Sequence, residues 1–579
     1  MLKNLLNRIL SAPPAAQSAP SAPVAMPDDV AGADALVAQG NEQEDAGDLA
    51  QAEALYRRAI AAAPGHARGH LNLGIVLTAR GDQDGAATAF ERVLAIDPGH
   101  PFGNYNYARL LVLRGDQARA WTLVQEALRA KPDFVQALEL SHRILRDEGF
   151  ARESLAVARQ IVERDPANWL HRSFELLVMN SAEDVTEDEM FRRHVEFGAQ
   201  LERLVPVRFP GYRDRGDAGR RLRVGYLSGD FMSHPVTFFL APVLEQHDRS
   251  QVEVFCYSLG TTPDGTTERV RAAADHWRDV AAASDDELAD AIHADGIDVL
   301  VDLAGHTGLP RLGVFCKRPA PVQVGWLGYL NTTGLTRMDF RLSDARSDPL
   351  AISQPLHTEQ LVHLPASQWC YRPVAQQEAE PVPPFERRGH LTFGSFNSAI
   401  KITPAACRRW GEVMLRVPAS RLVIGDMDSQ RKKGAIRRDI ASVGVAEDRI
   451  EFMPRAGVGR FLELYNGVDI TFDTFPYGGG TTTFDSLWMG VPVVAAVGRT
   501  PVSRSAASIL GALGLDDWVA SSIDDFVDVA VARASDLETL RTLRRTLRQR
   551  LQASPLTDLP RFTRDLEAAY REMWIARSA

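Results

Sequence analysis

The stretch FDTFPYGGGTTTFDSLWMG, residues 472–490, places three glycines and three threonines between a β-rich run and a helix-like run. The strand-like segment VDITFDTF, residues 468–475, leads through the loop PYGGG into the first turns of a helix. Glycines let backbone amides approach a ligand closely, and the first N–H groups of a helix have no partner within it. The stretch therefore predicts either an anion-binding loop or an ordinary strand-to-helix turn, and a glycine loop alone does not separate the two.

The same strand, loop and helix pattern runs through two regions of the chain. The strand-like runs of the first region, residues 221–375, are RLRVGYLS (221–228), VEVFCYSL (252–259), GIDVLVDL (296–303) and PVQVGWLGY (321–329). Those of the second region, residues 389–579, are HLTFGSF (390–396), SRLVIG (420–425), RIEFM (449–453), VDITFDTF (468–475) and VPVVAA (491–496). Buried runs of this kind predict two Rossmann-like α/β domains with parallel sheets, joined by a linker rich in Pro and Glu. Ligands of such sheets bind beyond the carboxyl ends of the strands.

The glycine loop satisfies this rule, because it directly follows a strand of the second domain. Thr481, Thr482 and Thr483 supply hydroxyls beside the unpaired first-turn N–H groups, and Gly479 and Gly480 precede them. We expect these five residues to bind an anion.

Three further residues of the second domain fit the same ligand. Lys401, in the segment GSFNSAIKITP (394–404), lies just before an expected helix start, where its ammonium would reach the anion, although an isolated lysine is usually solvated. Asn397 lies in the same loop as Lys401, and we assign it to the same expected ligand site. Asp485, one turn into the helix after the glycine loop, suits the two hydroxyls of a ribose.

Two histidines of the first domain follow strands. His234, in SGDFMSHPVTFFL, would hydrogen-bond a sugar or move a proton, or else cap a helix. His306, in DLAGHTG, would line the cleft or be structural. Asp426 and Asp428 resemble a metal-binding pair, but no further ligands cluster with them, so we assign no metal.

Residues 33–168 contain a repeat with a period of 34 residues. Prolines and glycines recur at this spacing: Pro64, Pro98, Pro132 and Pro166, and Gly47, Gly81, Gly115 and Gly149. Two helices per 34 residues is the tetratricopeptide pattern, which predicts four repeats with a concave face for an extended peptide, or else a scaffold or dimer contact. Asn72, Asn104 and Asn106 would either bond a peptide backbone there or be solvated. A helical connection over residues 169–220 follows.

Composition limits the remaining possibilities. The chain has 579 residues and a net charge of −10, and its pI is 5.8, so no global positive field draws it to nucleic acid. No run is long enough to span a membrane. The four cysteines are far apart, which is typical of a reduced cytoplasmic protein. MLKNLLNRIL reads as a short amphipathic helix and not as an export signal, and residues 1–30 as a flexible leader.

Taken together, these segments resemble glycosyltransferase family 41, which comprises the tetratricopeptide-bearing protein O-GlcNAc transferases and their SPINDLY relatives. The resemblance runs from about residue 33 to the end and is carried by LRVGYLSGDFMSHPV (222–236), GIDVLVDLAGHTG (296–308), RPAPVQVGWLGYLNTTGL (318–335), LTFGSFNSAIKITP (391–404) and DTFPYGGGTTTFDSLWMGVPVV (473–494). It implies a GT-B fold, a nucleotide-sugar donor, no cofactor or metal, and inverting transfer to Ser or Thr of a protein held by the repeats. A homodimer stays open.

The resemblance also assigns roles by position. Lys401 matches the family's diphosphate-binding lysine, Thr481 and Thr482 its diphosphate-binding threonines, Asp485 its ribose-binding aspartate, and His234 its active-site histidine.

The donor is less closely defined by the resemblance. The glycines before the threonines are closer to the SPINDLY branch, whose plant member uses GDP-fucose, than to the Asn-Gly-His of the UDP-GlcNAc enzymes. Phe461 and Leu330 also replace residues that line the donor site in the family. UDP-GlcNAc is the default donor and GDP-fucose the main alternative. Another sugar on flagellin, and a scaffold without catalysis, also stay open.

Overall fold

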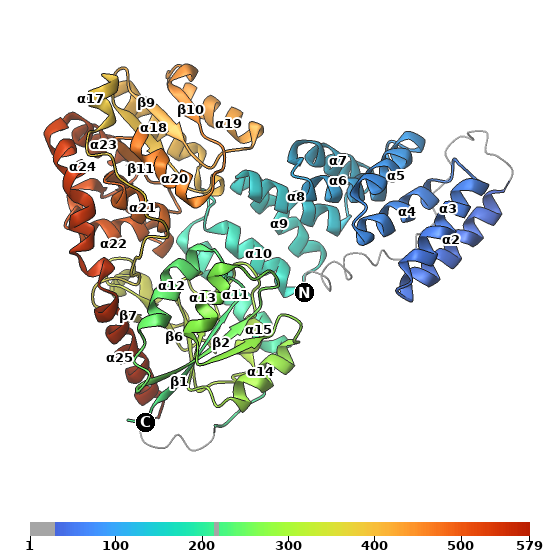
Figure 1. Cartoon of the computed structure of the whole chain (residues 1–579), viewed down its shortest axis with the longest axis horizontal. Helices are drawn as coiled ribbons and strands as arrows, with labels where there is room; N and C mark the ends of the chain where they lie inside the picture. Colours follow the sequence, from blue (N-terminus) through green and yellow to red (C-terminus); the bar gives the residue numbers. More distant parts are fainter. Residues whose placement is uncertain (1–28, 213–218, 579) are drawn as a thin grey trace. The chain divides into compact units, whose positions relative to one another are not determined.

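The computed structural model describes residues 29–212 and 219–578 (Figure 1). The amphipathic helix expected at the N-terminus lies outside the described residues, as does nearly all of the leader expected over residues 1–30. The chain divides into two units, Met1–Leu145 with Ala156–Asp165, and Arg146–Leu155 with Pro166–Ala579.

Paired helices with a 34-residue spacing form the first unit, as the repeat predicts, and their last pair extends into the second. They are α2 (Val30–Asp45), α3 (Leu49–Ala62), α4 (Ala67–Arg80), α5 (Gln83–Ile96), α6 (Pro101–Leu113), α7 (Gln117–Ala130), α8 (Val135–Glu148) and α9 (Ala151–Arg164). Asp48, Asp82 and Asp116 cap the second helix of successive pairs, each accepting from the N–H three residues on. Tyr56 and Phe90, which occupy equivalent positions in two repeats, are fully buried between the helices.

The asparagines of the repeats bond mainly within the array. Asn104 is buried, and its amide donates to the carbonyls of Pro98 and His100, so its role is structural, and both the expected peptide contact and the solvated alternative are wrong for it. Asn72 donates to the side chain of Asn41 and Asn106 to the carbonyl of Phe102.

The connection to the α/β region contains α10 (Trp169–Met179) and α11 (Glu187–Leu204). A seven-stranded parallel sheet follows, with the order β3-β2-β1-β4-β5-β6-β7. Its strands are β1 (Leu222–Ser228), β2 (Val252–Ser258), β3 (His276–Asp279), β4 (Val299–Asp302), β5 (Val322–Gly325), β6 (Phe340–Ser343) and β7 (Gln360–His363).

A second parallel sheet, with the order β10-β9-β8-β11-β12-β13, forms the C-terminal half. Its strands are β8 (Thr392–Ser395), β9 (Arg421–Ile424), β10 (Ile450–Phe452), β11 (Ile470–Phe472), β12 (Val493–Ala496) and β13 (Val519–Ala520). The two sheets confirm the predicted pair of α/β domains. Four strands were not predicted (β3, β6, β7 and β13), because these short runs carry charged or polar residues or have only two residues.

Helices cover both sheets. In the N-terminal half they are α12 (Pro235–Gln246), α13 (Gly265–Ala273), α14 (Asp285–Ala294), α15 (Leu312–Cys316) and α16 (Leu350–Ser353). In the linker and the C-terminal half they are α17 (Pro384–Arg388), α18 (Pro404–Arg416), α19 (Gln430–Ala441), α20 (Val458–Leu464), α21 (Thr481–Trp488), α22 (Ser505–Ala512), α23 (Phe526–Ser535), α24 (Leu537–Gln552) and α25 (Leu559–Ser578). Within the described residues, no helix has the length and apolar character needed to cross a membrane.

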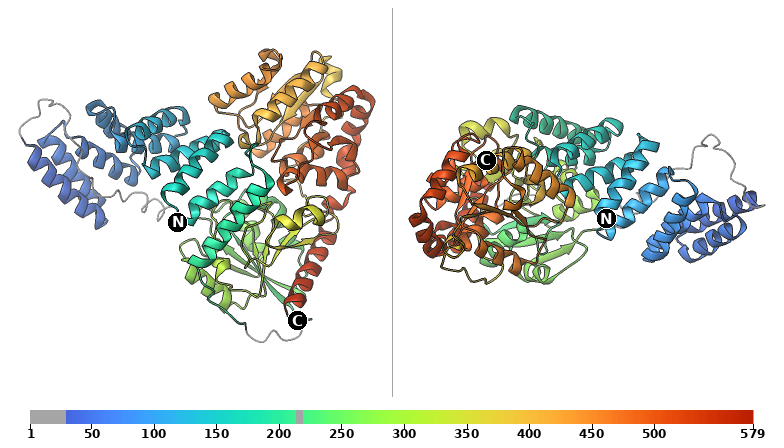
Figure 2. Two further views of the ribbon diagram at one scale, coloured as in Figure 1. Left: turned by 180° about the vertical axis from the view of Figure 1, so that it is seen from behind. Right: turned by 90° about the horizontal axis from the view of Figure 1, so that it is seen from above.

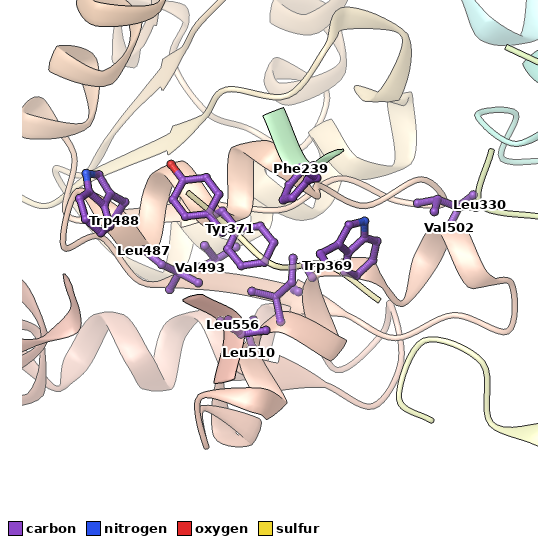
Figure 3. Close-up of a cluster of buried hydrophobic side chains, with 14 of the residues drawn as sticks. Phe239, Leu330, Trp369, Tyr371, Leu487, Trp488, Val493, Val502, Leu510 and Leu556 are labelled. Atoms are coloured by element: carbon purple, nitrogen blue, oxygen red, sulfur yellow. The ribbon is translucent and has the colours of Figure 1, made fainter. Parts of the chain in front are cut away.

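One continuous apolar core joins the two α/β halves. It contains Phe239 of α12 together with Leu487 and Trp488 of α21, and Figure 3 shows these side chains around Tyr371. The C-terminal helix α25 returns to the N-terminal half (Figure 2). There the hydroxyl of Tyr570 lies 3.3 Å from that of Tyr226. The halves are therefore held together by burial and by the C-terminal helix, in addition to the linker.

Helix α11 approaches the loop after β5 at backbone contact distance. A Cβ at Gly334 would lie 1.9 Å from the carbonyl oxygen of His194, and the φ of Gly334 is +79°. A Cβ at Gly198, on the same helix, would lie 1.8 Å from the carbonyl oxygen of Gly334. Only glycines allow this packing.

We expect Gly334→Ala to lower the free energy of unfolding by about 3 kcal/mol or more, because backbone must move apart. Gly389→Ala is the matched control, since Gly389 has a φ of +71° and open space around its Cβ position. That change should cost only the left-handed strain, about 1 kcal/mol. Thermal unfolding of both variants checks this, and equal losses would contradict the packing argument.

Candidate functional site

The candidate site lies at the N-terminus of α21. The helix follows β11 through the glycine loop, and its N-cap, Gly480, offers no side chain to cap it. The N–H groups of Thr483 and Phe484 donate to the carbonyl of Gly480. The N–H groups of Thr481 and Thr482, at the first two helical positions, have no intrahelical acceptor and are available to an anion.

Lys401 lies on a short turn, Ala399–Lys401, that follows β8. Its Nζ donates to the carbonyl oxygen of Gly478 at 2.9 Å and stands 3.9 Å from the centroid of the Tyr477 ring. Burial lowers the pKa of Lys401 to about 8, and the nearby carboxylate of Asp473 opposes the shift. The ammonium is thus held against the glycine loop, in a setting where charge is poorly screened.

The carboxylate of Asp473 holds the glycine loop in place through hydrogen bonds. Its Oδ1 accepts from the N–H of Gly479 at 2.6 Å and from the amide of Asn397 at 3.4 Å. Burial raises the pKa of Asp473 to about 6. Sequence reasoning missed this residue, although an acidic residue directly after a buried strand is a signal that would have found it.

Several residues that were expected to bind the anion instead hold the loop. The N–H of Gly479 is occupied by Asp473, and the buried hydroxyl of Thr483 donates to the carbonyl of Gly479 at 3.1 Å. The hydroxyl of Thr482 donates to Oδ1 of Asn397 at 2.9 Å. Asn397 therefore links the loop after β8 to α21, and Thr482 offers an anion its backbone N–H and not its hydroxyl proton.

Asp485 lies one turn into α21 and is buried. Its Oδ1 accepts from the hydroxyl of Tyr371 at 2.8 Å. Burial raises the pKa of Asp485 to about 7, and the Tyr371 hydrogen bond opposes the shift. The Tyr371 ring is parallel to that of Phe484, with centroids 4.9 Å apart. Tyr371, at the end of the N-terminal half, thus orients the carboxylate, a role that nothing in its sequence context indicated.

His234 caps α12 at the carboxyl end of β1. Its Nδ1 lies 3.4 Å from the N–H of Val236, from which it accepts, and 3.7 Å from Oδ2 of Asp230. Its side chain is 38% exposed. The capping alternative is therefore present in the structure, and it leaves Nε2 available to a ligand.

His306 is buried in the core of the N-terminal half. Its Nδ1 pairs with the hydroxyl of Ser173 at 2.8 Å and its Nε2 with the carbonyl of Thr333 at 3.1 Å. Burial lowers the pKa of His306 well below its usual range, so the ring stays neutral. Of the two roles expected for His306, the structure shows the structural one, and the donor-binding assignment is wrong because both ring nitrogens are occupied.

The acidic pair after β9, Asp426 and Asp428, interacts with Arg455. Asp426 lies 3.6 Å from the guanidinium of Arg455, and Asp428 accepts from the N–H of the same residue at 3.2 Å. Over residues 29–212 and 219–578, no group of three or more His, Cys, Asp or Glu residues is placed to hold a metal ion.

The site is thus an anion cradle of two helix N–H groups and one lysine, with a carboxylate one turn away, at the carboxyl ends of β8 and β11. The model of glycosyl transferase family 41 matches residues 195–371 and 388–566, and a tetratricopeptide repeat model matches residues 37–101. The family match covers more than half of the chain, and the chain therefore belongs to glycosyltransferase family 41.

Individual relatives agree with this family. The chain is similar to the probable UDP-N-acetylglucosamine–peptide N-acetylglucosaminyltransferase SPINDLY of Solanum lycopersicum, with 37% identity over 410 residues, 69% of this chain and 43% of that protein. It is also similar to the probable UDP-N-acetylglucosamine–peptide N-acetylglucosaminyltransferase SEC of Arabidopsis thaliana, with 32% identity over 64% of this chain and 38% of that protein. The matches span less than half the length of these plant relatives.

A solved structure resembles nearly the whole chain. It is a lysine-to-methionine mutant of the O-GlcNAc transferase from Thermobaculum terrenum, with 32% identity and a TM-score of 0.69. The similarity covers 95% of this chain and 98% of that one. The combination of tetratricopeptide repeats with a GT-B pair of domains is therefore shared with a protein of known structure.

The pKa values at the cradle predict a bell-shaped pH dependence for nucleotide-sugar binding. Below about pH 7 the carboxylate of Asp485 takes up a proton and accepts ligand hydroxyls less well. Above about pH 8 Lys401 loses the positive charge that the cradle offers to an anion. We expect the affinity for UDP-GlcNAc or GDP-fucose to be highest between these values and to fall about tenfold within one to two pH units on either side.

Calorimetric titrations from about pH 5.5 to about pH 9.5 check this expectation. Lys401→Arg should remove the alkaline limb alone, because a guanidinium keeps its charge there. Asp485→Asn should remove the acid limb to the extent that Asp485 causes it. A flat profile in the unmodified protein would contradict the assignment of both residues.

Proposed function

We propose that this chain is an inverting, metal-independent protein O-glycosyltransferase. It moves a sugar from a nucleotide-sugar donor to the hydroxyl of Ser or Thr in a protein acceptor. Membership of family 41 supports the reaction class, and the cradle of Lys401 with the N–H groups of Thr481 and Thr482 is the observation that supports the chemistry.

The chemistry follows from charge. A Ser or Thr hydroxyl attacks the anomeric carbon from the side opposite the leaving group, so its bond to carbon forms as the bond to the diphosphate oxygen breaks. The hydroxyl proton passes to water or to an oxygen of the departing diphosphate. The departing diphosphate gains negative charge in this step. Lys401 and the two N–H groups are already oriented toward an anion before the reaction starts, and preorganised donors of this kind lower the barrier most effectively.

His234 is better suited to position the sugar than to remove the acceptor's proton. With Nδ1 accepting from the N–H of Val236, the neutral ring carries its own proton on Nε2. That nitrogen then donates to a sugar oxygen. A base role requires the other tautomer, in which Nδ1 donates toward Asp230, 3.7 Å away.

UDP-GlcNAc is our default donor, on the descriptions of SPINDLY, SEC and the Thermobaculum terrenum enzyme. GDP-fucose is the alternative, favoured by the GGG sequence before the threonines. The tetratricopeptide repeats would hold the acceptor protein, as concave solenoid faces commonly do. The four cysteines are free and buried, which supports a reducing compartment such as the cytoplasm.

We expect Lys401→Ala to lower the transfer rate by 10²-fold or more while leaving the fold intact, because a single oriented donor to the developing anion is typically worth about that factor. Incorporation of labelled sugar into a co-expressed acceptor measures the loss, and circular dichroism checks the fold. Lys433→Met is the control, since the ammonium of Lys433 makes no ion pair or hydrogen bond in the described part of the chain. Near-normal turnover by Lys401→Ala would overturn the assignment.

The donor is identified by thermal shift with UDP-, GDP- and CMP-sugars, followed by intact-mass analysis of acceptors. A mass increase of one N-acetylhexosamine supports GlcNAc transfer, and that of one deoxyhexose supports fucose transfer. Stabilisation by no nucleotide at all would favour the alternative of a binding scaffold without catalysis.

A further inference from the structure

A second lysine, Lys432, is buried close to the turn that carries Lys401. It lies on the first turn of α19, and 5% of its surface is exposed. Its Nζ donates to the carbonyl oxygen of Ile402 at 2.6 Å and to that of Gly149 at 2.6 Å. One acceptor directly follows Lys401 in the chain, and the other belongs to the turn between α8 and α9.

That turn, residues 148–150, fits closely against the Lys401 turn. Gly149 has a φ of +92°, and a Cβ there would lie 2.5 Å from the carbonyl oxygen of Ala399, so no other side chain fits without movement. Glu148 is buried, accepts from the hydroxyl of Ser429 at 3.1 Å and pairs with Arg431. All of these residues belong to the second unit.

The segment after Lys401 is held from the opposite direction as well. Thr403, the N-cap of α18, donates its hydroxyl to the carbonyl oxygen of Phe475 at 2.9 Å. Phe475 belongs to the stretch that begins the glycine loop. Lys401 itself donates to Gly478 of the same loop. The Lys401 segment is therefore bonded both to Lys432 and to the glycine loop.

Burying a lysine costs desolvation free energy that packing alone does not require. Burial lowers the pKa of Lys432, and within the described residues its ammonium makes no ion pair. An apolar side chain of similar length would fill the same space without the cost of removing an ammonium from water. What it could not supply is a hydrogen bond that fixes two carbonyl groups at once.

We propose that Lys432 is a positioning residue for sugar transfer. By joining the carbonyls of Ile402 and Gly149, it holds the turn Ala399–Lys401 where the ammonium of Lys401 faces the diphosphate. This inference rests on the proposed function, because it assigns Lys432 to the same cradle.

The test compares Lys432→Met, Lys432→Arg and the control Lys433→Met in the full-length protein. UDP and GDP are the probes for binding, and the donor selected by thermal shift is used for turnover. We expect Lys432→Met to weaken nucleotide binding about tenfold, to raise the KM for the donor and to lower kcat. Lys432→Arg should recover at least half of the binding loss, and Lys433→Met should change none of these values. A residue that only supports the fold would reduce the melting temperature and the active fraction, but not the Kd of the folded protein.

A double-mutant cycle with Lys401→Ala gives the decisive result. If Lys432 acts through Lys401, adding Lys432→Met to Lys401→Ala should weaken nucleotide binding no further. Equal losses in both backgrounds, or an unchanged Kd in Lys432→Met, would overturn the inference while leaving the proposed function in place. Failure of the unmodified protein to bind any nucleotide would overturn both.

Discussion

The hydrogen bond from the N–H of Gly479 to the buried carboxylate of Asp473 is the interaction on which the site depends. Three consecutive glycines have more conformational freedom than any other tripeptide, and an anion cradle needs a single shape. Asp473 supplies that shape by binding the loop and the amide of Asn397 at the same oxygen. Because this bond and the one from the N–H of Gly478 to the carbonyl of Val502 use two of the loop's N–H groups, an anion is offered chiefly those of the helix, and the loop serves mainly as a rigid support.

Burial gives the groups of the cradle their unusual acidities. It lowers the pKa of Lys401 to about 8 and raises that of Asp473 to about 6 and that of Asp485 to about 7. Each shift reports a charge that water no longer stabilises fully. A diphosphate entering this region would meet charges that are weakly screened, which is the physical basis of the proposal that transfer needs no metal ion.

The two halves of the catalytic region contribute to a single site through contacts that cross between them. Tyr371 comes from the N-terminal half, yet it orients the carboxylate of Asp485 in α21. Helix α25 belongs to the end of the chain, yet the carboxylate of its Glu567 accepts a hydrogen bond from the backbone of Asp248 and contacts His247 at 2.8 Å. The orientation of the Asp485 carboxylate therefore depends on a residue of the other half.

Local pattern was sufficient for the architecture. The 34-residue repeat, the buried β-rich runs and the stretch at residues 472–490 predicted the repeats, the two parallel sheets and the strand–loop–helix turn of the candidate site, because each depends on periodicity or on residues close together in the chain. Strands such as β3 and β6 were missed because their charged residues lie at strand positions where neighbouring segments supply the ion pairs.

What the sequence by itself determined was the set of chemical groups: Lys401, the threonines, Asp485 and His234. The tertiary structure decided which of these groups remain available to a ligand. The hydroxyls of Thr482 and Thr483 are used in hydrogen bonds to Asn397 and Gly479, and both ring nitrogens of His306 have partners. The tertiary structure also brings in Asp473, Tyr371 and Lys432, whose partners lie elsewhere in the chain. The reason is physical. Whether a donor is available depends on which acceptors the fold brings within hydrogen-bonding distance, and those acceptors come from segments that no local pattern connects.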